Sequence, residues 1–180
     1  MKITTPLNTA AARKLRAGDV VEISGILYTA RDAAHKKMIE ALAEGNPLPI
    51  DLRDQIIYYV GPCPAKPGEI IGSCGPTTSG RMDAYAPELI RLGLRGMIGK
   101  GERLPSVYEA MQQFGAVYFG ATGGAGALLA ECVQSVEEIA YPELMSESLK
   151  KLVVKDFPAI VIADCAGNNL YQMGKAKYQK

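Results

Sequence analysis

Short apolar runs alternate with helix-forming stretches through the second half of the chain, and this alternation restricts the fold more than any other feature. The patterns predict helices over residues 83–92, 105–114 and 125–133, and strands over residues 96–99, 116–119 and 158–164. Strands that are separated by helices commonly run in the same direction within one sheet. The order therefore favours α/β layers with at least partly parallel strand pairing.

The first half of the chain is predicted to be strand-rich. Strands are expected over residues 19–28, with a break or bulge at Gly25, over residues 55–60 and, more weakly, over residues 69–73. Between them, residues 31–44 contain strong helix formers with an apolar stripe, and Gly45 supplies a stop. A chain of 180 residues is long enough for one compact core, so a single domain is expected.

Charge and hydropathy exclude several classes of protein. Hydrophobic residues make up 48% of the chain, and 20 Lys and Arg balance 19 Asp and Glu. Such a chain lacks the basic field that attracts nucleic acid or anionic membrane surfaces, so neither is expected as a partner. No apolar run reaches the roughly 20 residues that span a bilayer. Because the N-terminus also lacks a signal-peptide pattern, a cytoplasmic protein is expected.

The four cysteines are spread along the chain without any CxxC pair. They are Cys63, Cys74, Cys132 and Cys165. This spacing is poor for zinc and for ferredoxin-type clusters, so no metal site is expected on this chain. In a reducing compartment all four are expected to be free thiols.

The most informative segment is residues 75–83, between a predicted strand and a predicted helix. Its two glycines, one proline and three consecutive hydroxyl residues leave backbone amides free to bind a ligand, and the following helix adds its positive end. A carboxylate would bind well there, and Arg81 could bind the same anion with two hydrogen bonds. The alternative is an ordinary N-cap region, because Ser and Thr before a helix usually cap it.

A second candidate is the start of the helix over residues 31–44. Arg31 and His35 lie four residues apart on one helix face, and Asp32 favours the helix dipole by its early position. A cation at a helix N-terminus is locally unfavourable, and an incoming anion would relieve that cost. His35 is the only histidine of the chain. Charge patterning alone favours the plainer interpretation, a solvated charged face.

Two glycine-rich stretches complete the candidates. Gly99-Lys100-Gly101 ends a predicted strand, where α/β sheets usually bind ligands, although most such tripeptides are plain surface turns. Residues 120–126 fit neither the P-loop pattern nor GxGxxG spacing. We interpret the second stretch as close backbone packing at a subunit contact.

Four stretches carry a family resemblance: Ser24-Gly25 with residues 30–36, residues 75–83, residues 99–101 and residues 164–169. Together they resemble the iron–sulfur hydro-lyases that comprise class I fumarate hydratase and tartrate dehydratase, in particular the β subunit or the equivalent C-terminal domain. The resemblance covers nearly the whole chain, and the motif over residues 75–83 is its most specific part. It implies one domain over residues 1–180 with a swivelling β/β/α fold.

The resemblance also implies an activity, the reversible hydration of fumarate to malate by a complex of this chain with an α subunit. A [4Fe-4S] cluster on that α subunit would act as a Lewis acid on the substrate hydroxyl. A heterotetramer with a β–β contact is implied as well. This chain would bind the substrate through Arg31, Arg81, Lys100, Gly75 and Gly101. The implied catalytic residues are Thr77 for proton transfer, Thr78 beside it, and His35 as a relay or as a support for Asp32.

Three other interpretations stay open. Tartrate dehydratase would use the same chemistry on a dihydroxy diacid, although the Ser79-Gly80 pair before Arg81 looks more like the fumarase side of the family. A non-catalytic dicarboxylate-binding module could use the same helix N-termini. A cysteine enzyme could be built on Cys74, near a helix start that would lower the pKa of its thiol.

Overall fold

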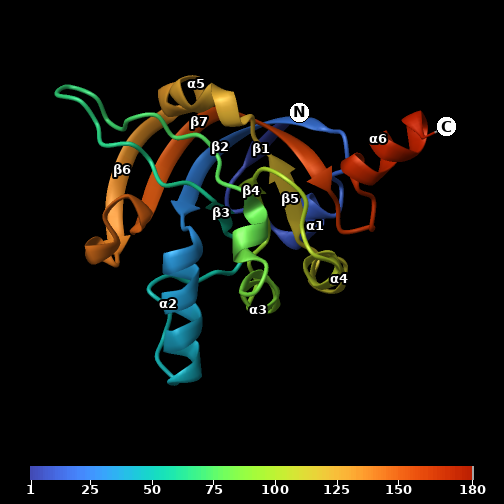
Figure 1. Cartoon of the computed structure of the whole chain (residues 1–180), viewed down its shortest axis with the longest axis horizontal. Coiled ribbons are helices and arrows are strands. Elements are labelled where there is room, and N and C mark those ends of the chain that lie inside the picture. The colour runs from blue at the N-terminus through green and yellow to red at the C-terminus, as the bar shows by residue number, and fades with distance from the viewer. Residues whose placement is uncertain (180) are drawn as a thin grey trace.

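The computed structural model describes residues 1–179, which form a mixed α/β structure around one seven-stranded sheet (Figure 1). The strands are β1 (Lys2–Thr4), β2 (Val20–Thr29), β3 (Ile56–Tyr58), β4 (Gly96–Gly99), β5 (Val117–Gly120), β6 (Val133–Ala140) and β7 (Leu149–Ala163). The helices are α1 (Thr9–Ala12), α2 (Asp32–Ala43), α3 (Ala86–Arg91), α4 (Pro105–Phe114), α5 (Gly126–Glu131) and α6 (Leu170–Tyr178), with 3-10 helices η1 (Ser79–Met82), η2 (Gly123–Ala125) and η3 (Pro142–Glu147).

The sheet is closed. Its strand order is β1-β2-β3-β4-β5-β7-β6, and β2 also pairs with β7, so β2, β3, β4, β5 and β7 form a barrel. The pairs β1–β2, β2–β3, β3–β4 and β4–β5 are parallel, whereas β7 runs antiparallel to its neighbours. The predicted partly parallel pairing is therefore confirmed.

The predicted break at Gly25 is confirmed as a register shift in the β2–β7 ladder. Gly25 has a φ of 115°, and an added Cβ would lie 2.4 Å from Thr5 Oγ1. Glycine is needed at this position because other residues rarely adopt such a φ and because no side chain fits.

The core forms two layers, one on each side of the barrel wall. Ile56 and Tyr58 of β3 belong to one cluster, shared with β2, β5 and β7. Ile57 and Tyr59 belong to the other, because successive side chains of a strand point to opposite faces. The second cluster includes the apolar faces of α2, α3 and α4, which lie together on one side of the sheet (Figure 1). Burial on both faces explains the continuous apolar run of β3.

The prediction of a strand over residues 69–73 is wrong. Within the described chain, the segment between β3 and η1 contains no strand or helix, and it runs as a long loop beside β6 (Figure 1). Pro62, Pro64 and Pro67 have no N–H group to donate to a ladder. The base of the loop is closed by a hydrogen bond from Cys63 N to Ser73 O, 2.9 Å long.

The helix predicted over residues 83–92 begins later than expected, since α3 starts at Ala86 and a turn over residues 83–85 separates it from η1. Asp83 is not the N-cap of α3, which is Tyr85. Its carboxylate instead accepts hydrogen bonds from Arg103 Nε and Leu104 N, each at 2.6 Å. The expected helix N-terminus is therefore not directly beside residues 75–79.

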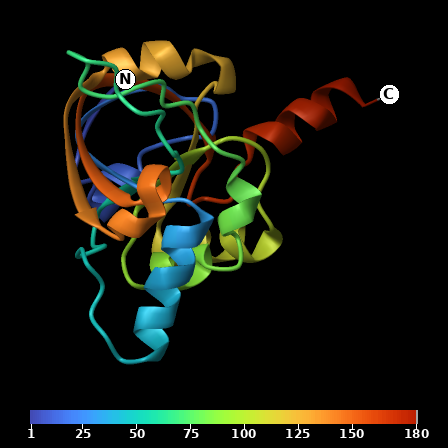
Figure 2. The same ribbon diagram turned by 60° about the vertical axis from the view of Figure 1, so that its left-hand side comes forward.

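The C-terminal third contains elements that the sequence did not predict: β6, the first part of β7, and α6. β6 and β7 pair with opposite charges across the ladder, such as Glu137 with Lys151. Helix α6 is capped by the Asn169 side chain and projects from the body of the molecule (Figure 2). No helix within residues 1–179 combines the length and the apolar content needed to cross a membrane.

Candidate functional site

The carboxyl ends of parallel strands bring the predicted site residues to one edge of the barrel. Arg31 follows β2, the segment with Thr77 follows β3, and Lys100 follows β4. Because these three strands are parallel, their carboxyl ends lie on the same side of the sheet. The carboxyl ends of parallel strands are where α/β barrels and sheets commonly bind ligands.

Backbone hydrogen bonds join the segment with Thr77 to the turn with Lys100. Thr77 N donates to Tyr59 O (2.7 Å), and Lys100 N donates to Thr77 O (3.3 Å). Thr78 and Lys100 form an isolated parallel bridge, and Ser79 N donates to Lys100 O (2.9 Å). The two threonines and the lysine therefore lie side by side at the end of β4.

Glycines allow the backbones of this region to approach closely. An added Cβ at Gly75 would lie 2.9 Å from Gly123 O, so residues 120–126 do pack closely against backbone, here that of the same chain, and the predicted subunit contact stays a prediction. An added Cβ at Gly123 would lie 3.3 Å from Lys100 Nζ. Gly101 has a φ of 83°, a backbone angle that residues other than glycine rarely adopt. The lysine is thus flanked by backbone that has no side chains to cover it.

Arg81 and Lys100 both carry exposed side chains near Thr78. Arg81 lies in η1, where its backbone N–H approaches Thr78 O at 3.5 Å. Among residues 1–179, neither cation makes an ion pair with a carboxylate. Two cations without a carboxylate partner, on segments joined by backbone hydrogen bonds, are suited to an external anion.

Arg31 is held differently, at the N-cap of α2. Its Nη2 lies 3.3 Å from Glu147 Oε1, and its Nε lies 3.6 Å from Asp32 Oδ1. The side chain is 21% exposed. It covers Gly61, where an added Cβ would lie 3.0 Å from Nη1. Two carboxylates and one glycine therefore set the direction of the guanidinium group.

His35 is completely buried in α2, at 0% exposure. Its backbone N and its ring Nδ1 both donate to Arg31 O, at 2.9 Å and 2.8 Å, which leaves a lone pair on Nε2. The ring meets Tyr59 edge-on, with 5.3 Å between centroids. His35 therefore holds the backbone carbonyl of Arg31 in place through two hydrogen bonds.

Burial lowers the pKa of His35 from 6.5 to about 4. The unfolded chain takes up a proton at this histidine as the pH falls through 6.5, whereas the folded chain does not until about pH 4. Stability from neutral His35 should therefore be complete above pH 6.5 and lost progressively below it, by about 3 kcal/mol in all. Urea unfolding at pH 7.0 and pH 5.0 measures the loss.

The matched control for this pH effect is His35→Asn, which keeps a short donor but cannot titrate in this range. Its stability should fall less between pH 7.0 and pH 5.0 than that of the wild type. Proton NMR of the single histidine should show no titration near pH 6.5 in the folded chain. A ring that titrates near pH 6.5 would contradict the expected burial effect.

The predicted residues thus form two groups on one edge. The first is Gly75, Thr77, Thr78, Arg81, Lys100 and Gly101, and the second is Arg31, Asp32 and His35. Tyr59 connects them, because its carbonyl accepts from Thr77 N and its ring packs against His35. Helix α2 also contacts η1 directly.

Sequence reasoning missed the partners that hold these groups in place, above all Glu147 and Tyr118. Glu147 lies in η3, far along the chain from Arg31, so no local pattern pairs the two. Tyr118 is one of several aromatic residues in predicted strands, and only its position relative to Gly101 distinguishes it. No sequence signal identifies either residue.

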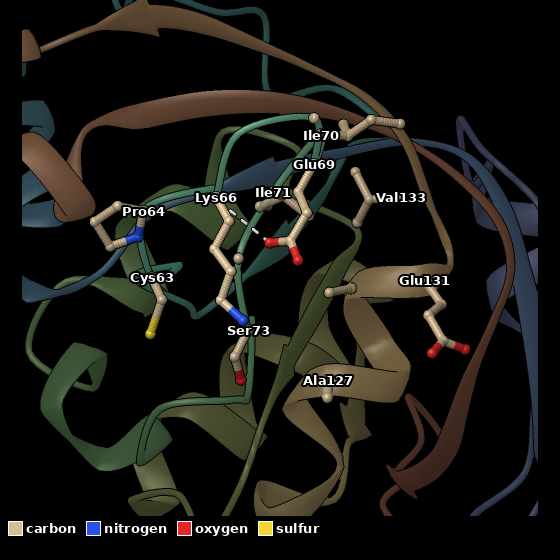
Figure 3. Close-up of a pocket in the computed structure, with 13 residues that line it drawn as sticks. Cys63, Pro64, Lys66, Glu69, Ile70, Ile71, Ser73, Ala127, Glu131 and Val133 are labelled. Carbon is tan, nitrogen blue, oxygen red and sulfur yellow. Dashed lines mark hydrogen bonds between the residues drawn. The ribbon is translucent and has the colours of Figure 1, made fainter.

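A cavity of about 620 Å³ lies elsewhere (Figure 3). It is enclosed by the long loop and by α5, and its lining includes Lys66, Glu69, Ile70, Ala127 and Val133. None of the predicted site residues lines it. The candidate site is therefore a surface at the strand ends, away from this cavity.

The four cysteines are free thiols, as predicted. Cys74 is buried, and this burial raises the pKa of its thiol to about 11. The expectation that a helix start would lower the pKa of Cys74 is wrong, because desolvation of the thiolate dominates. Cys74 is not an activated nucleophile.

The structure is thus a mixed α/β domain with a closed sheet, and the predicted cations and hydroxyl residues follow the carboxyl ends of its parallel strands. The chain matches the family model described as "Fumarase C-terminus" over residues 1–174, and it belongs to that family.

Curated relatives include two kinds of hydro-lyase. The chain is 40% identical over 154 residues to "Fumarate hydratase class I, aerobic" of Escherichia coli (strain K12), covering 84% of this chain but only 28% of that enzyme. It is 40% identical over 175 residues to "Putative L(+)-tartrate dehydratase subunit beta" of Methanocaldococcus jannaschii, covering 93% of this chain and 90% of that subunit. For "L(+)-tartrate dehydratase subunit beta" of Escherichia coli (strain K12), identity is 38% over 178 residues, covering 96% and 87% of the two chains.

Proposed function

We propose that this chain is the β subunit of a [4Fe-4S]-dependent fumarate hydratase that converts fumarate reversibly to malate. The observation that carries the proposal is the juxtaposition of Lys100 with Thr77 and Thr78, next to Arg81. Neither cation has a carboxylate partner within residues 1–179. A small diacid would supply the missing negative charges. The names of the relatives support a hydro-lyase activity.

In this proposal the cations stabilise charge that develops during the reaction. Removal of a proton next to a carboxylate increases the negative charge on that carboxylate, and cations held in place stabilise it. Arg31, Arg81 and Lys100 bind the substrate carboxylates. Gly75 and Gly101 let the backbone approach the substrate.

Thr77 is proposed as the proton-transferring group, with Thr78 holding substrate or water beside it. A threonine hydroxyl is a very weak base, so nearby cations must stabilise its ionised form. Lys100 is the cation that we propose for this role, because its backbone contacts both threonines. Asp32 and His35 orient Arg31, one through its carboxylate and the other through its ring N–H.

We place the [4Fe-4S] cluster on a partner α subunit. Within the described residues, no three His, Cys, Asp or Glu side chains are grouped to hold a metal ion, and the four cysteines lack cluster-type spacing, which supports this proposal. The enzyme would be a cytoplasmic heterotetramer with a β–β contact. Residues 1–180 would form one domain of the swivelling β/β/α type, in keeping with the closed mixed sheet.

The second candidate is the β subunit of a tartrate dehydratase. It is favoured by the coverage of the relatives, since the chain spans 90% and 87% of two such subunits but 28% of the fumarate hydratase. Both candidates use the same residues for the same reaction type. They differ in the substrate, a diacid with one hydroxyl group or with two.

Co-purification with the α subunit and steady-state assays of malate, fumarate and the tartrate isomers test the proposal. We expect kcat/KM to be highest for fumarate and malate, and expect Thr77→Val to abolish most of that activity. Higher kcat/KM for a tartrate isomer would favour the second candidate. Tight malate binding by the isolated chain, without turnover in any complex, would instead indicate a non-catalytic dicarboxylate-binding module.

A further inference from the structure

We propose that Tyr118 and Ser79 are positioning residues that hold the Lys100 turn against the segment with Thr77. The inference rests on the proposed function, because it assigns these residues to the binding of the same diacid. Neither side chain would touch the substrate, since both are completely buried. They would act through the backbone on each side of Lys100.

Two hydrogen bonds define the arrangement. The Tyr118 hydroxyl donates to Gly101 O at 2.8 Å, and the Ser79 hydroxyl lies 2.9 Å from the Tyr118 oxygen. A phenol has one proton, which Tyr118 gives to Gly101, so Ser79 must be the donor to Tyr118. The result is a directed chain from Ser79 through Tyr118 to Gly101, here called the hydroxyl chain.

The two residues of the hydroxyl chain contact the backbone of Lys100 and of both its neighbours. Ser79 N donates to Lys100 O at 2.9 Å, and Tyr118 binds the carbonyl of the next residue. On the other side, an added Cβ at Gly99 would lie 2.0 Å from Ser79 Oγ. Ser79 therefore lies directly against Gly99, and the backbone from Gly99 to Gly101 is fixed at every residue.

The Tyr118 ring packs against a buried ion pair. Arg103 lies over the rings of Tyr118 and Tyr59, 5.2 Å from each centroid. Asp83 Oδ1 accepts from Arg103 Nε at 2.6 Å, with both side chains almost fully buried. Burial also raises the pKa of the Tyr118 hydroxyl, which keeps it a donor at neutral pH. The orientation of the donor is thus set before any substrate arrives.

The hydroxyl chain should strengthen binding of the diacid by fixing the backbone of Lys100. Lysine has a long flexible side chain, so its charge is placed accurately only if its backbone is fixed. Without the Tyr118 hydroxyl, the carbonyl of Gly101 loses its partner, and the turn gains freedom that substrate binding must remove. The loss should weaken binding of the diacid more than it slows the chemical step.

The test is Tyr118→Phe in the complete complex with the α subunit, alone and combined with Lys100→Met. Tyr118→Phe should raise KM for malate about tenfold and change kcat by less than about threefold. In the Lys100→Met background the same change should raise KM no further, because the residue through which it acts is gone. Ser79→Ala should behave like Tyr118→Phe and serves as the second variant if the phenylalanine variant does not fold.

The control is Tyr28→Phe on β2, whose hydroxyl makes no hydrogen bond within residues 1–179, and KM should not change. An unchanged KM in both Tyr118→Phe and Ser79→Ala overturns the inference. An equal rise of KM with and without Lys100 overturns it too, because the effect would then be a general structural one. If Lys100→Met itself leaves kcat/KM unchanged, the fault lies in the proposed function of Lys100.

Discussion

Replacing Arg103 with methionine should lower the free energy of unfolding by about 3–5 kcal/mol. Arg103 Nε donates to Asp83 Oδ1 at 2.6 Å, and both side chains are buried, at 0% and 2% exposure. Methionine fills much of the same volume but leaves the Asp83 carboxylate with a single partner, Leu104 N. A buried carboxylate without its cation is costly because it has also lost its water. Urea unfolding followed by far-UV circular dichroism measures the effect.

Arg91→Met is the matched control for the buried pair. Arg91 also pairs with a carboxylate, Glu88, but both are exposed on α3, and such pairs contribute well under about 1 kcal/mol. Asp83→Asn combined with Arg103→Met should cost less than the sum of the two single changes, because the first already removes the buried charge. A loss in Arg103→Met as small as that in Arg91→Met would show that the buried pair contributes little.

Replacing Lys100 with methionine should reduce kcat/KM for malate by about 100-fold to 1000-fold. Methionine keeps the length of the side chain and removes its charge, so the bound carboxylate loses one of its proposed cations, on the residue whose backbone N donates to Thr77 O. The exposed Lys100 makes no ion pair within residues 1–179, so its removal should leave folding stability nearly unchanged. Steady-state kinetics of the complex and a urea titration give the two quantities.

Lys36→Met provides the comparison for Lys100→Met. Lys36 is also exposed, but its Nζ lies 3.7 Å from Glu40 on the solvent side of α2, so its removal should leave kcat/KM within about twofold. Equal kinetics for the two variants would remove Lys100 from the site. A large loss of stability in Lys100→Met would mean that the loss of activity reports on folding instead.

Local patterns located several elements well. The helix predicted over residues 105–114 is observed as α4 with the same bounds, because Pro105 begins it and Gly115, with a φ of 76°, ends it. The strand over residues 96–99 is observed as β4. By contrast, β6 and the start of β7 carry many charged residues, and they form strands because they pair with each other across the ladder.

In the candidate site, too, local features could be predicted from the sequence and long-range contacts could not. The motif over residues 75–83 and the tripeptide around Lys100 stood out in the sequence, since glycine, proline and hydroxyl residues have local backbone preferences. The contacts that orient these residues did not stand out. Glu147 reaches Arg31, and Tyr118 reaches Gly101, from distant parts of the chain.

By itself, the sequence determined the mixed α/β character, the bulge at Gly25 and the bounds of α4, and it marked the segments in which we propose the site. These features depend on interactions within a few residues, such as helical periodicity, proline geometry and the φ values open to glycine. Only the tertiary structure decided the closure of the sheet by β7, the late start of α3 and the partners of Arg31 and Lys100. Those outcomes depend on pairing between distant segments, in which burial and hydrogen bonding outweigh local preference.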